Sequence, residues 1–415
     1  MNAEILSVGS ELVAGRIADT NAAYLSENLL RLGIRVSRHT ALGDDLEAVR
    51  QVLLDIADRA DVAVVTGGIG PTPDDITRQA FAEAARVELT ESPEAAEALR
   101  ARFALWGREP SPSNLIQAHI PQGARLIANP NGTAAGFAIQ LKSCLFFCLP
   151  GVPFEMKAMC ERDVFPELAR RSGQSAAVRL LQVFGLGESV VGERLHNLMR
   201  RGRSPDVATQ VSGGIITVRI TATGADLARL TERVEADAAV VRERLAENIY
   251  AEGGLSLAEA VARLLEKRNK TIAIAESCTG GEIAARLTDV PGISRCFLQG
   301  VVAYSNEAKV RRFGVPEDVI VRHGAVSAET ALAMAEGMRR TSGADIALST
   351  TGIAGPSGGT QDKPVGLVYT ALSATDARVV REHRLGGDRA AVRNRAARHA
   401  LNLARLYLEG KLNDE

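Results

Sequence analysis

Residues 270–287 read KTIAIAESCTGGEIAARL, the pattern of a strand that turns directly into a helix. The apolar run at 270–274 predicts a buried strand, and the apolar spacing at 282–287 predicts a helix. Ser277 would lie on the tight turn between them, where the small residues that follow let backbone N–H groups approach a ligand. This turn suits a serine nucleophile with a backbone oxyanion hole and suits a phosphate-binding loop equally well. An ordinary helix N-cap at Ser277 or Thr279 explains the same residues.

The alternation of strands and helices around this turn extends over most of the chain, which has 415 residues. Hydrophobic residues make up 46% of the sequence and aromatic residues only 4%, a composition that points to an α/β fold rich in Ala, Val, Leu and Ile. The length predicts more than one domain, and we expect domains at 1–172, 173–252 and 253–415. The element pattern predicts two α/β sandwich domains with mostly parallel sheets, joined by a small α+β domain. Ligands of such sheets bind at the carboxyl ends of the strands.

Composition also limits the partners and the compartment. The net charge is −1, so no overall basic field attracts nucleic acid or an anionic membrane, and we expect neither to be bound directly. None of the 5 cysteines forms a C-x₂-C pair, which predicts buried, reduced thiols rather than a zinc site. The N-terminus lacks a signal-peptide pattern, and no apolar run approaches the ~20 residues that span a bilayer. We therefore expect a soluble, cytoplasmic protein.

Reactive and small residues lie at the ends of two further predicted strands. Tyr304 ends the strand at 297–304 and Lys309 follows it, and Thr351, Gly352 and Gly355 follow the strand at 346–350. A lysine acts as a base only where burial or nearby charge lowers its pKa. By itself, Lys309 is more simply a surface lysine, and Tyr304 a core or rim residue. Arg389, which precedes a predicted helix at 390–409, could bind a phosphate or form an ion pair with Asp388.

A second glycine-rich loop follows the predicted buried strand at 62–65 and reads TGGIGPTPDD over residues 66–75. It has neither the spacing of a dinucleotide fingerprint nor that of a P-loop. Asp74 and Asp75 would open a helix at 76–85, where N-capping and the helix dipole already explain acidic residues. The same pair beside Gly67 and Gly68 could hold Mg²⁺ against a substrate pyrophosphate.

The middle segment, 173–252, predicts the order β-α-β-β-α. Its clearest feature is a hairpin around Ser212-Gly213-Gly214, and residues 250–254 would be the linker that ends the segment. KH domains grip nucleic acid through a GXXG loop between helices, and we find no such arrangement here. We expect the segment to serve as a spacer and dimer contact.

Motifs over the first 156 residues resemble the N-terminal domain of the CinA family, the competence/damage-inducible proteins. The matching stretches are Gly9-Ser10-Glu11-Leu12, Asp19-Thr20-Asn21, the loops at 66–75 and 129–137, Leu149-Pro150-Gly151-Val152-Pro153 and Glu155-Met156. That domain is similar to molybdopterin-binding MoaB/MogA proteins. In the family it is associated with a divalent-metal-dependent ADP-ribose pyrophosphatase activity. The resemblance makes Asp74 and Asp75 candidates for a metal (Mg²⁺ or similar) or phosphate site, with Glu11, Asn21, Gly67 and Gly68 nearby.

Motifs of the last domain resemble the PncC family of nicotinamide-nucleotide amidohydrolases, which convert nicotinamide mononucleotide and water to nicotinate mononucleotide and ammonia. The matching stretches are residues 275–281, 304–309, 324–327, 351–356 and 363–366. The order of the middle segment is similar to the KH-like domain of full-length CinA proteins. Together these resemblances cover almost the whole chain.

The resemblance implies serine acyl transfer without a metal or other cofactor. Ser277 would be the nucleophile and Tyr304 with Lys309 its base. Thr351 would position the substrate amide or the base, and Arg389 would hold the 5′-phosphate. Backbone N–H groups around Thr279, Gly280 and Gly281 would bind the oxyanion, with Gly352 and Gly355 lining the substrate site.

Three questions stay open at the level of sequence. Cys278 is a rival nucleophile, because thiolates are intrinsically stronger nucleophiles than alcohols. The whole chain could instead be a non-enzymatic pterin- or nucleotide-binding module, or an adaptor in competence and recombination. We expect a homodimer that acts on small pyridine nucleotides.

Overall fold

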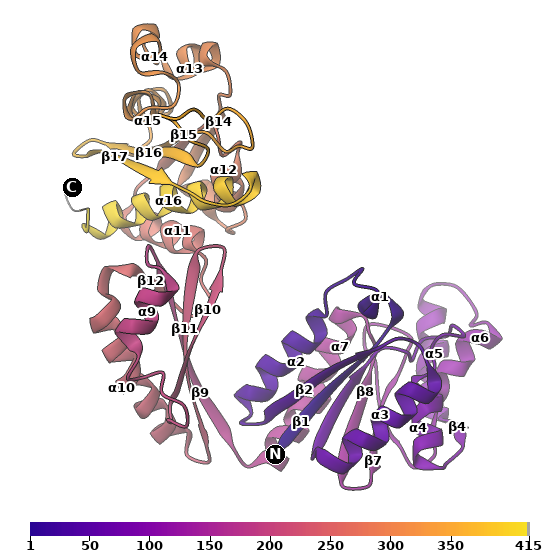
Figure 1. Cartoon of the computed structure of the whole chain (residues 1–415). Coiled ribbons are helices and arrows are strands. Elements are labelled where there is room, and N and C mark those ends of the chain that lie inside the picture. The colour runs from indigo at the N-terminus through magenta and orange to yellow at the C-terminus, as the bar shows by residue number, and fades with distance from the viewer. Residues whose placement is uncertain (413–415) are drawn as a thin grey trace. The chain divides into compact units, whose positions relative to one another are not determined.

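The computed structural model describes residues 1–412, and the chain divides into two compact units. The first consists of Met1–Val178 with Ala222–Arg233, and the second of Arg179–Thr221 with Val234–Glu415. Both contain strands and helices in alternation, as predicted (Figure 1).

A six-stranded sheet organises the first unit, in the order β2-β1-β3-β8-β7-β6. The first four strands of this order pair in parallel, whereas β7 and β6 are antiparallel additions. The elements are β1 (Asn2–Val8), α1 (Ser10–Val13), α2 (Thr20–Arg31), β2 (Arg35–Leu42), α3 (Leu46–Arg59), β3 (Val62–Thr66), α4 (Thr77–Ala85), β4 (Leu89–Glu91), α5 (Pro93–Leu105), α6 (Pro112–Leu115), β5 (His119–Pro121), β6 (Arg125–Ile127), β7 (Gly136–Leu141), β8 (Cys144–Leu149), α7 (Pro153–Met159) and α8 (Phe165–Ser172).

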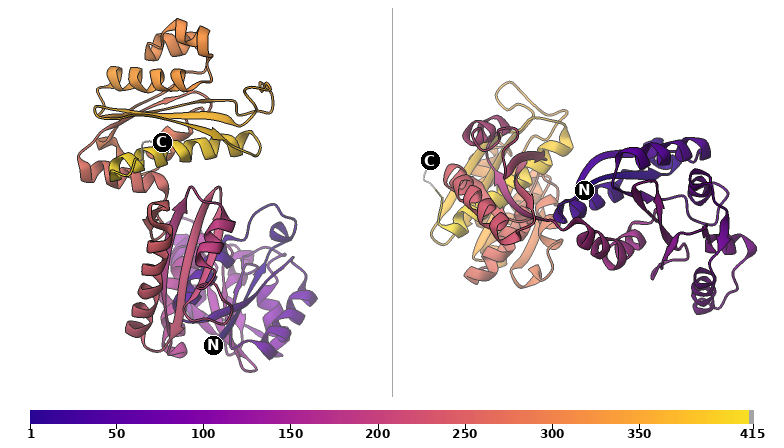
Figure 2. Two further views of the ribbon diagram at one scale, coloured as in Figure 1. Left: turned by 60° about the vertical axis from the view of Figure 1, so that its left-hand side comes forward. Right: turned by 90° about the horizontal axis from the view of Figure 1, so that it is seen from below.

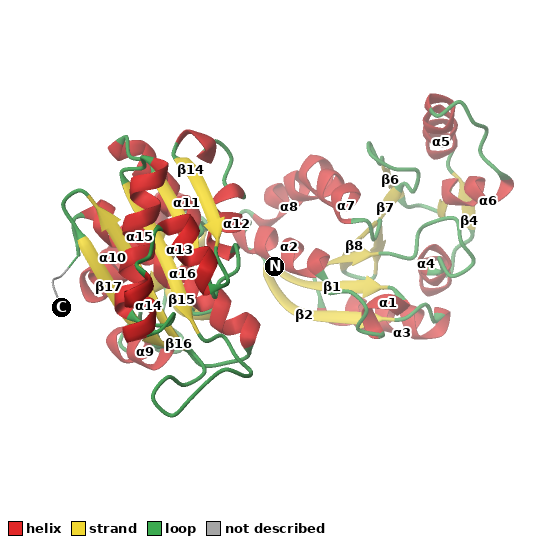
Figure 3. Cartoon of the chain, turned by 90° about the horizontal axis from the view of Figure 1, so that it is seen from above, coloured by secondary structure: helices red, strands yellow, loops and turns green. Residues whose placement is uncertain are grey.

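Helices cover both faces of this sheet because its central strands are apolar on both sides (Figure 3). Successive side chains of a strand point to opposite faces. Val62 and Val64 therefore pack with α2, α7 and α8, while Ala63 and Val65 pack with α3 and α4. The result is a three-layer α/β sandwich in which the strand ends carry the glycine-rich loops.

The middle segment has the order β9 (Ser175–Phe184), α9 (Glu188–Leu195), β10 (Asp206–Ser212), β11 (Ile215–Gly224), α10 (Leu227–Leu245) and β12 (Ile249–Glu252). Its sheet order is β10-β11-β9-β12, and the predicted hairpin joins β10 to β11. The predicted linker at 250–254 is wrong in its first half. Residues up to Glu252 pair with β9 as strand β12, and buried Tyr250 packs into the core.

A five-stranded sheet in the order β14-β13-β15-β16-β17 organises the rest of the second unit. Strands β14, β13 and β15 pair in parallel, and β16 and β17 follow as an antiparallel pair. The elements are α11 (Leu257–Arg268), β13 (Ile272–Glu276), α12 (Glu282–Thr288), β14 (Phe297–Val302), α13 (Asn306–Phe313), α14 (Glu317–His323), α15 (Ala328–Ser342), β15 (Ile346–Gly352), β16 (Leu367–Ala374), β17 (Arg378–Arg384) and α16 (Arg389–Glu409).

Figure 2 shows this sheet between two helical layers. Ile272 and Ile274 pack with α11, α12 and α16 on one face, and Ala273 and Ala275 pack with α13 and α15 on the other. The two α/β sandwiches and their mostly parallel strand pairing agree with the predicted fold class.

Two simpler sequence expectations can be checked directly. All five cysteines are free and buried, as predicted. None of the helices formed by residues 1–412 combines the length and the apolar character needed to cross a membrane.

Candidate active site

Three neighbouring parallel strands end together and present the residues singled out in the last domain. Glu276, the last residue of β13, pairs with Val302 of β14 on one side and with Thr350 of β15 on the other. The N–H of Ser277 donates to the carbonyl of Thr350 at 3.0 Å. Ser277 and Tyr304 therefore follow β13 and β14, and Thr351 is the next-to-last residue of β15, so all three lie at one edge of the sheet, where parallel sheets bind ligands.

A buried carboxylate holds the turn after β13. Glu276, 1% exposed, accepts hydrogen bonds from the N–H groups of Gly281 (2.9 Å), Ile283 (3.2 Å) and Ala284 (2.9 Å). These donors are the first N–H groups of α12, which would otherwise lack partners. The alternative expected from the sequence, an N-cap at Ser277 or Thr279, does not form, because neither side chain makes a cap hydrogen bond to this helix.

This arrangement corrects the predicted oxyanion donors. The N–H of Gly281 is bonded to Glu276, and the N–H of Gly280 donates to the carbonyl of Ser277 at 3.1 Å. Within residues 1–412, the N–H groups of Cys278 and Thr279 donate no hydrogen bond to another residue. The glycines instead shape the turn, since both have positive φ (62° and 95°), which is favourable for glycine alone.

Lys309 is a buried amine rather than a surface lysine. It lies on α13, is only 2% exposed, and its Nζ donates to the carbonyl of Tyr304 at 3.4 Å. No carboxylate among residues 1–412 forms an ion pair with it. Burial lowers the pKa of Lys309, and the opposing effects of Cys278 and Glu307 are smaller. A lysine in this state can accept a proton.

Cys278, in contrast to Lys309, lies in an environment that makes its side chain unreactive. Its side chain packs into a small apolar cluster with Ala354, Val368, Val392 and Ala396. Burial raises the pKa of this thiol to about 12. Because the thiolate is the nucleophilic form, a thiol in this setting is inert near neutral pH.

The remaining candidates form hydrogen bonds with one another or with nearby loops. Arg389 donates from Nη2 to the hydroxyl of Tyr304 at 2.6 Å and from Nη1 to the carbonyl of Gly355 at 2.8 Å. The alternative ion pair with Asp388 does not form, because Asp388 caps α16 through the N–H of Ala391. Thr351 donates its hydroxyl proton to the carbonyl of Ala325 at 2.6 Å, which leaves it free only to accept.

Sequence reasoning missed two residues here, Glu276 and Arg393. Arg393 donates from Nε and Nη2 to the carbonyl of Thr279, at 3.0 and 2.8 Å. The available signal was spacing, because arginines at positions i and i+4 of one helix lie on the same face. A buried acid directly before Ser277 gives no comparable signal.

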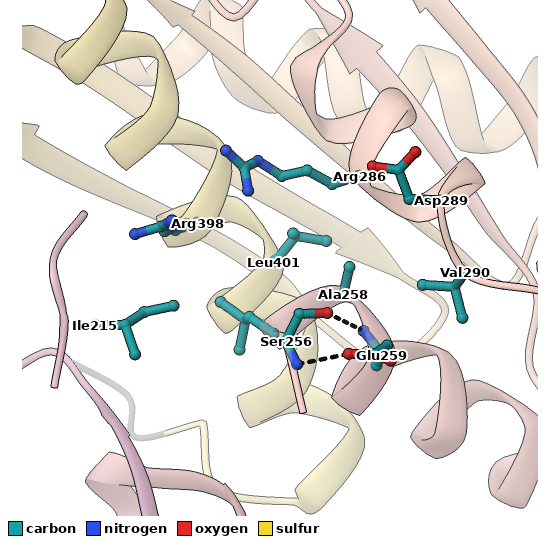
Figure 4. Close-up of a pocket in the computed structure, with 10 residues that line it drawn as sticks. Ile215, Ser256, Ala258, Glu259, Arg286, Asp289, Val290, Arg398 and Leu401 are labelled. Carbon is teal, nitrogen blue, oxygen red and sulfur yellow. Dashed lines mark hydrogen bonds between the residues drawn. The ribbon is translucent and has the colours of Figure 1, made fainter. Parts of the chain in front are cut away.

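A separate cavity of about 280 Å³ in the same unit contains none of the predicted site residues (Figure 4). Arg286 and Arg398 line it opposite Glu259 and Asp289, so its charges balance. Arg398 also donates to carbonyls at the tip of the β10–β11 hairpin.

The first unit brings together some of its predicted residues. Strands β1 and β3 are paired through Ser7 and Thr66, so the loops that contain Glu11 and Gly67 begin at one sheet edge. Gly67 lies so close to the carbonyl of Val8 that an added Cβ would overlap it, and its φ is 95°. Asn21 donates to the carbonyl of Gly151 at 2.8 Å, whereas its buried Oδ1 has no hydrogen-bond partner among residues 1–412. Glu11 is exposed on α1.

Asp74 and Asp75 do not open the helix as predicted, because α4 begins at Thr77. Asp75 instead closes the preceding loop. Its two carboxylate oxygens accept from the N–H of Gly70 (2.7 Å), the N–H of Thr72 (2.9 Å) and the hydroxyl of Thr72 (2.6 Å). Gly68 contacts the start of α4 instead, where its carbonyl accepts a hydrogen bond from the N–H of Thr77.

These contacts bear on the divalent cation implied by the resemblance. Asp75 does not fit the role of a metal ligand, since its oxygens are engaged within the loop. Asp74 is exposed, and hydrogen bonding by Thr72 lowers its pKa, so it fits as a single carboxylate ligand. No group of three or more His, Cys, Asp and Glu side chains within the described 412 residues could hold a metal by itself.

The fold and the site define a class of multidomain α/β proteins in which two three-layer sandwiches and a small α+β segment follow one another in the chain. Residues 4–170 match the family model of a probable molybdopterin binding domain, residues 178–251 that of the damage-inducible protein CinA KH domain, and residues 255–408 that of the CinA C-terminal domain. The chain belongs to the CinA family, as its resemblances indicated.

Relatives match from end to end. A putative competence-damage inducible protein of Caldanaerobacter subterraneus subsp. tengcongensis is 44% identical over 414 residues, 100% of both chains. A CinA-like protein of Kosmotoga olearia is 43% identical over 98% of this chain and 99% of its own. The crystal structure of competence/damage inducible protein CihA from Agrobacterium tumefaciens is 39% identical and covers 37% of this chain and 93% of its own, with a TM-score of 0.36.

Proposed function

We propose that the last domain hydrolyses the carboxamide of nicotinamide mononucleotide, giving nicotinate mononucleotide and ammonia, by serine acyl transfer. The observation that carries this proposal is the buried Lys309, which has no carboxylate partner among residues 1–412 and lies on the helix after β14, the strand next to the one that Ser277 follows. A nucleophilic hydroxyl needs a neighbouring base, and a desolvated amine is one of the groups that can serve.

In the proposed reaction, the neutral Nζ of Lys309 accepts the proton of Ser277, and Tyr304 assists the transfer. Oγ of Ser277 attacks the carboxamide carbon, and the oxygen that becomes negative is bound by the uncommitted N–H groups of Cys278 and Thr279. The proton on Lys309 passes to the leaving nitrogen, and ammonia departs. Water then attacks the acyl-enzyme, releases nicotinate mononucleotide and restores the Ser277 hydroxyl.

Arg389 would bind the 5′-phosphate of this substrate. It begins the 21-residue helix α16, it forms no ion pair with a carboxylate among residues 1–412, and a guanidinium at a helix N-terminus is a strong anion site. Thr351 would accept a hydrogen bond from the substrate amide.

Product analysis tests this function directly. Purified protein incubated with nicotinamide mononucleotide, with and without EDTA, should release ammonia and nicotinate mononucleotide in equal amounts under both conditions. Ser277→Ala should lower the rate by a factor of about 10³ or more. Cys278→Ala, the matched control at the neighbouring position, should retain most of the activity. If Ser277→Ala retains substantial deamidase activity, the serine mechanism is wrong.

The first domain carries a second proposal, pyrophosphate hydrolysis of ADP-ribose. Supporting it are the close approach of Gly67 to the carbonyl of Val8 at the end of β1 and an exposed carboxylate, Asp74, in the loop that follows Gly67. Asp74 together with substrate phosphate oxygens would hold a divalent cation, which withdraws charge from the phosphate group when bound.

The two acids give a matched pair of variants for this second activity. Incubation with ADP-ribose and Mg²⁺ should release AMP in the wild type and in Ser277→Ala. EDTA and Asp74→Asn should each abolish the release, whereas Asp75→Asn should mainly destabilise the loop. Release of AMP that persists in EDTA would rule out the metal role. If neither substrate is turned over, a non-enzymatic binding or adaptor role becomes the better account of the chain.

A further inference from the structure

Helix α16 contacts the loops after all three parallel strands through two arginines in its first two turns. Arg389 bonds to Tyr304, after β14, and to Gly355, after β15. Arg393 bonds to the carbonyl of Thr279, after β13. The first turns of α16 therefore tie together the three loops that form the candidate site.

Tyr304 depends on this helix more than its neighbours do. Its side chain is 59% exposed and belongs to none of the apolar clusters that the described residues form. Packing therefore cannot hold the phenol in one place, and the hydrogen bond from Arg389 at 2.6 Å is the contact that fixes its hydroxyl. The main-chain carbonyl of Tyr304 accepts a hydrogen bond from Nζ of Lys309, so the backbone of Tyr304 lies beside the proposed base.

Arg389 can hold Tyr304 and a phosphate at the same time. A guanidinium has five N–H donors in a planar fork. Two of them are used, by the Tyr304 hydroxyl and the Gly355 carbonyl, which leaves three for an anion. The carbonyl of Gly355 also fixes the plane of the fork, so that the guanidinium does not swing away from Tyr304 when an anion binds.

We propose that Arg389 is a positioning residue for Tyr304, so that phosphate recognition and proton transfer from Ser277 share one guanidinium. This inference rests on the proposed deamidase function. Its consequence is that loss of Arg389 lowers kcat as well as raising KM, because the same guanidinium orders Tyr304 and binds the phosphate.

Two substrates separate this role from simple phosphate binding. Nicotinamide riboside carries the same carboxamide as nicotinamide mononucleotide but no phosphate. If Arg389 only binds phosphate, Arg389→Ala raises KM for the mononucleotide and leaves turnover of the riboside unchanged. If Arg389 also positions Tyr304, Arg389→Ala lowers kcat with both substrates, on the order of tenfold or more. Unchanged riboside turnover in this variant would overturn the inference.

A double-mutant cycle identifies Tyr304 as the group through which Arg389 acts. In a Tyr304→Phe background, Arg389→Ala should have no further effect on kcat, although it should still raise KM for the mononucleotide. Additive effects on kcat would contradict the inference. Arg395→Ala is the matched control, because Arg395 lies on the same helix and donates to the carbonyl of Gly386 instead. Arg395→Ala should leave kcat and KM unchanged for both substrates.

An activity-independent measurement keeps this inference apart from the proposed function. The chain has 5 tyrosines, so ¹⁹F spectra of fluorotyrosine-labelled protein are simple enough to assign with Tyr304→Phe. The Tyr304 line should shift and narrow in Arg389→Ala and stay unchanged in Arg395→Ala. If the ¹⁹F resonance of Tyr304 is the same in Arg389→Ala as in the wild type, Arg389 does not position Tyr304. Absence of deamidation by the wild type, with the line behaving as expected, would reject the proposed function alone.

Discussion

At the scale of single residues, the candidate site contains ionisable groups that are buried away from water. Lys309 is an amine buried without a carboxylate, Glu276 is a carboxylate buried with three backbone donors, and Cys278 is a thiol buried among apolar side chains. Burial disfavours the charged form of each group unless hydrogen bonds or an opposite charge compensate it. For Lys309 the compensation by Cys278 and Glu307 is smaller than the effect of burial, so the pKa of its amine is lowered.

Lys309 should give the deamidase reaction a characteristic pH dependence. The base role needs the neutral amine, so kcat/KM should rise with pH through the pKa of Lys309, which burial holds below the ordinary lysine value. Lys309→Met should remove this rising limb and lower the rate by a factor of about 10²–10⁴. A pH–rate profile of both proteins over the stable range is the measurement.

The same group should affect stability with a defined sign. The folded state loses the Lys309 proton at a lower pH than the unfolded state, so wild-type stability rises with pH between the two pKa values. The free energy of unfolding of Lys309→Met should therefore exceed that of the wild type most at low pH. The difference between the two proteins should shrink as the pH increases. An advantage that grows with pH in urea unfolding would contradict the burial of a charged amine.

Glu276 should contribute more to stability than other acids near the turn. Glu276→Ala leaves three N–H groups of α12 without acceptors, at a cost of roughly 2–4 kcal/mol in the free energy of unfolding. Glu282→Ala, in the first turn of the same helix, removes an i,i+4 ion pair with Arg286 and should cost less than about 1 kcal/mol. If urea unfolding shows the same loss of free energy of unfolding in both variants, Glu276 does not hold the turn.

At the scale of elements, the sequence predicts most reliably where a local signal and the tertiary structure agree. Helix α11 (Leu257–Arg268) begins where Ser256 and Glu259 form a capping box, a local pattern that is visible in the sequence. The Gly213-Gly214 hairpin likewise follows from local turn chemistry. By contrast, β12 was predicted as a linker, because its pairing with β9 is a contact between distant residues that no local pattern reveals.

The candidate site follows the same division. Alternating strands and helices place Ser277, Tyr304 and Thr351 at one sheet edge, and this could be predicted from the order of elements alone. The sequence could not predict which N–H and hydroxyl groups already donate hydrogen bonds within the protein. The N–H of Gly281 and the hydroxyl of Thr351 are engaged by Glu276 and Ala325, which depends on exact distances between separate segments.

Two glycines in helices should respond to alanine in opposite directions. Gly337 lies in α15 against the carbonyl of Phe313, at the end of α13, where an added Cβ would overlap that group. Gly337→Ala should lower the free energy of unfolding by roughly 1–3 kcal/mol despite the better helix propensity of alanine. Gly192 lies in α9 with open space around it, so Gly192→Ala should raise stability by about 0.5–1 kcal/mol. Thermal and urea unfolding of both variants provide the test, and a stabilising Gly337→Ala would show that the two helices do not approach this closely.

At the scale of the whole molecule, two compact units should unfold with some independence. Calorimetry of the intact chain should show more than one transition, because two-state behaviour holds mainly for small single domains. Gly337→Ala should lower the temperature of one transition and leave the other in place. A single transition that shifts as a whole would show that the units are thermodynamically coupled.

The placement of α16 has a consequence for the order in which the candidate site forms during folding. Arg389 follows Tyr304 by 85 residues, and Arg393 follows Thr279 by 114 residues. Contacts between such distant residues require long loops to close, so they form slowly. The N–H of Gly281 and the carboxylate of Glu276 are only 5 residues apart, so the turn after β13 can close before α16 docks. The folding chain would thus pass through a state in which this turn is formed while Tyr304 still lacks the contact that orders it.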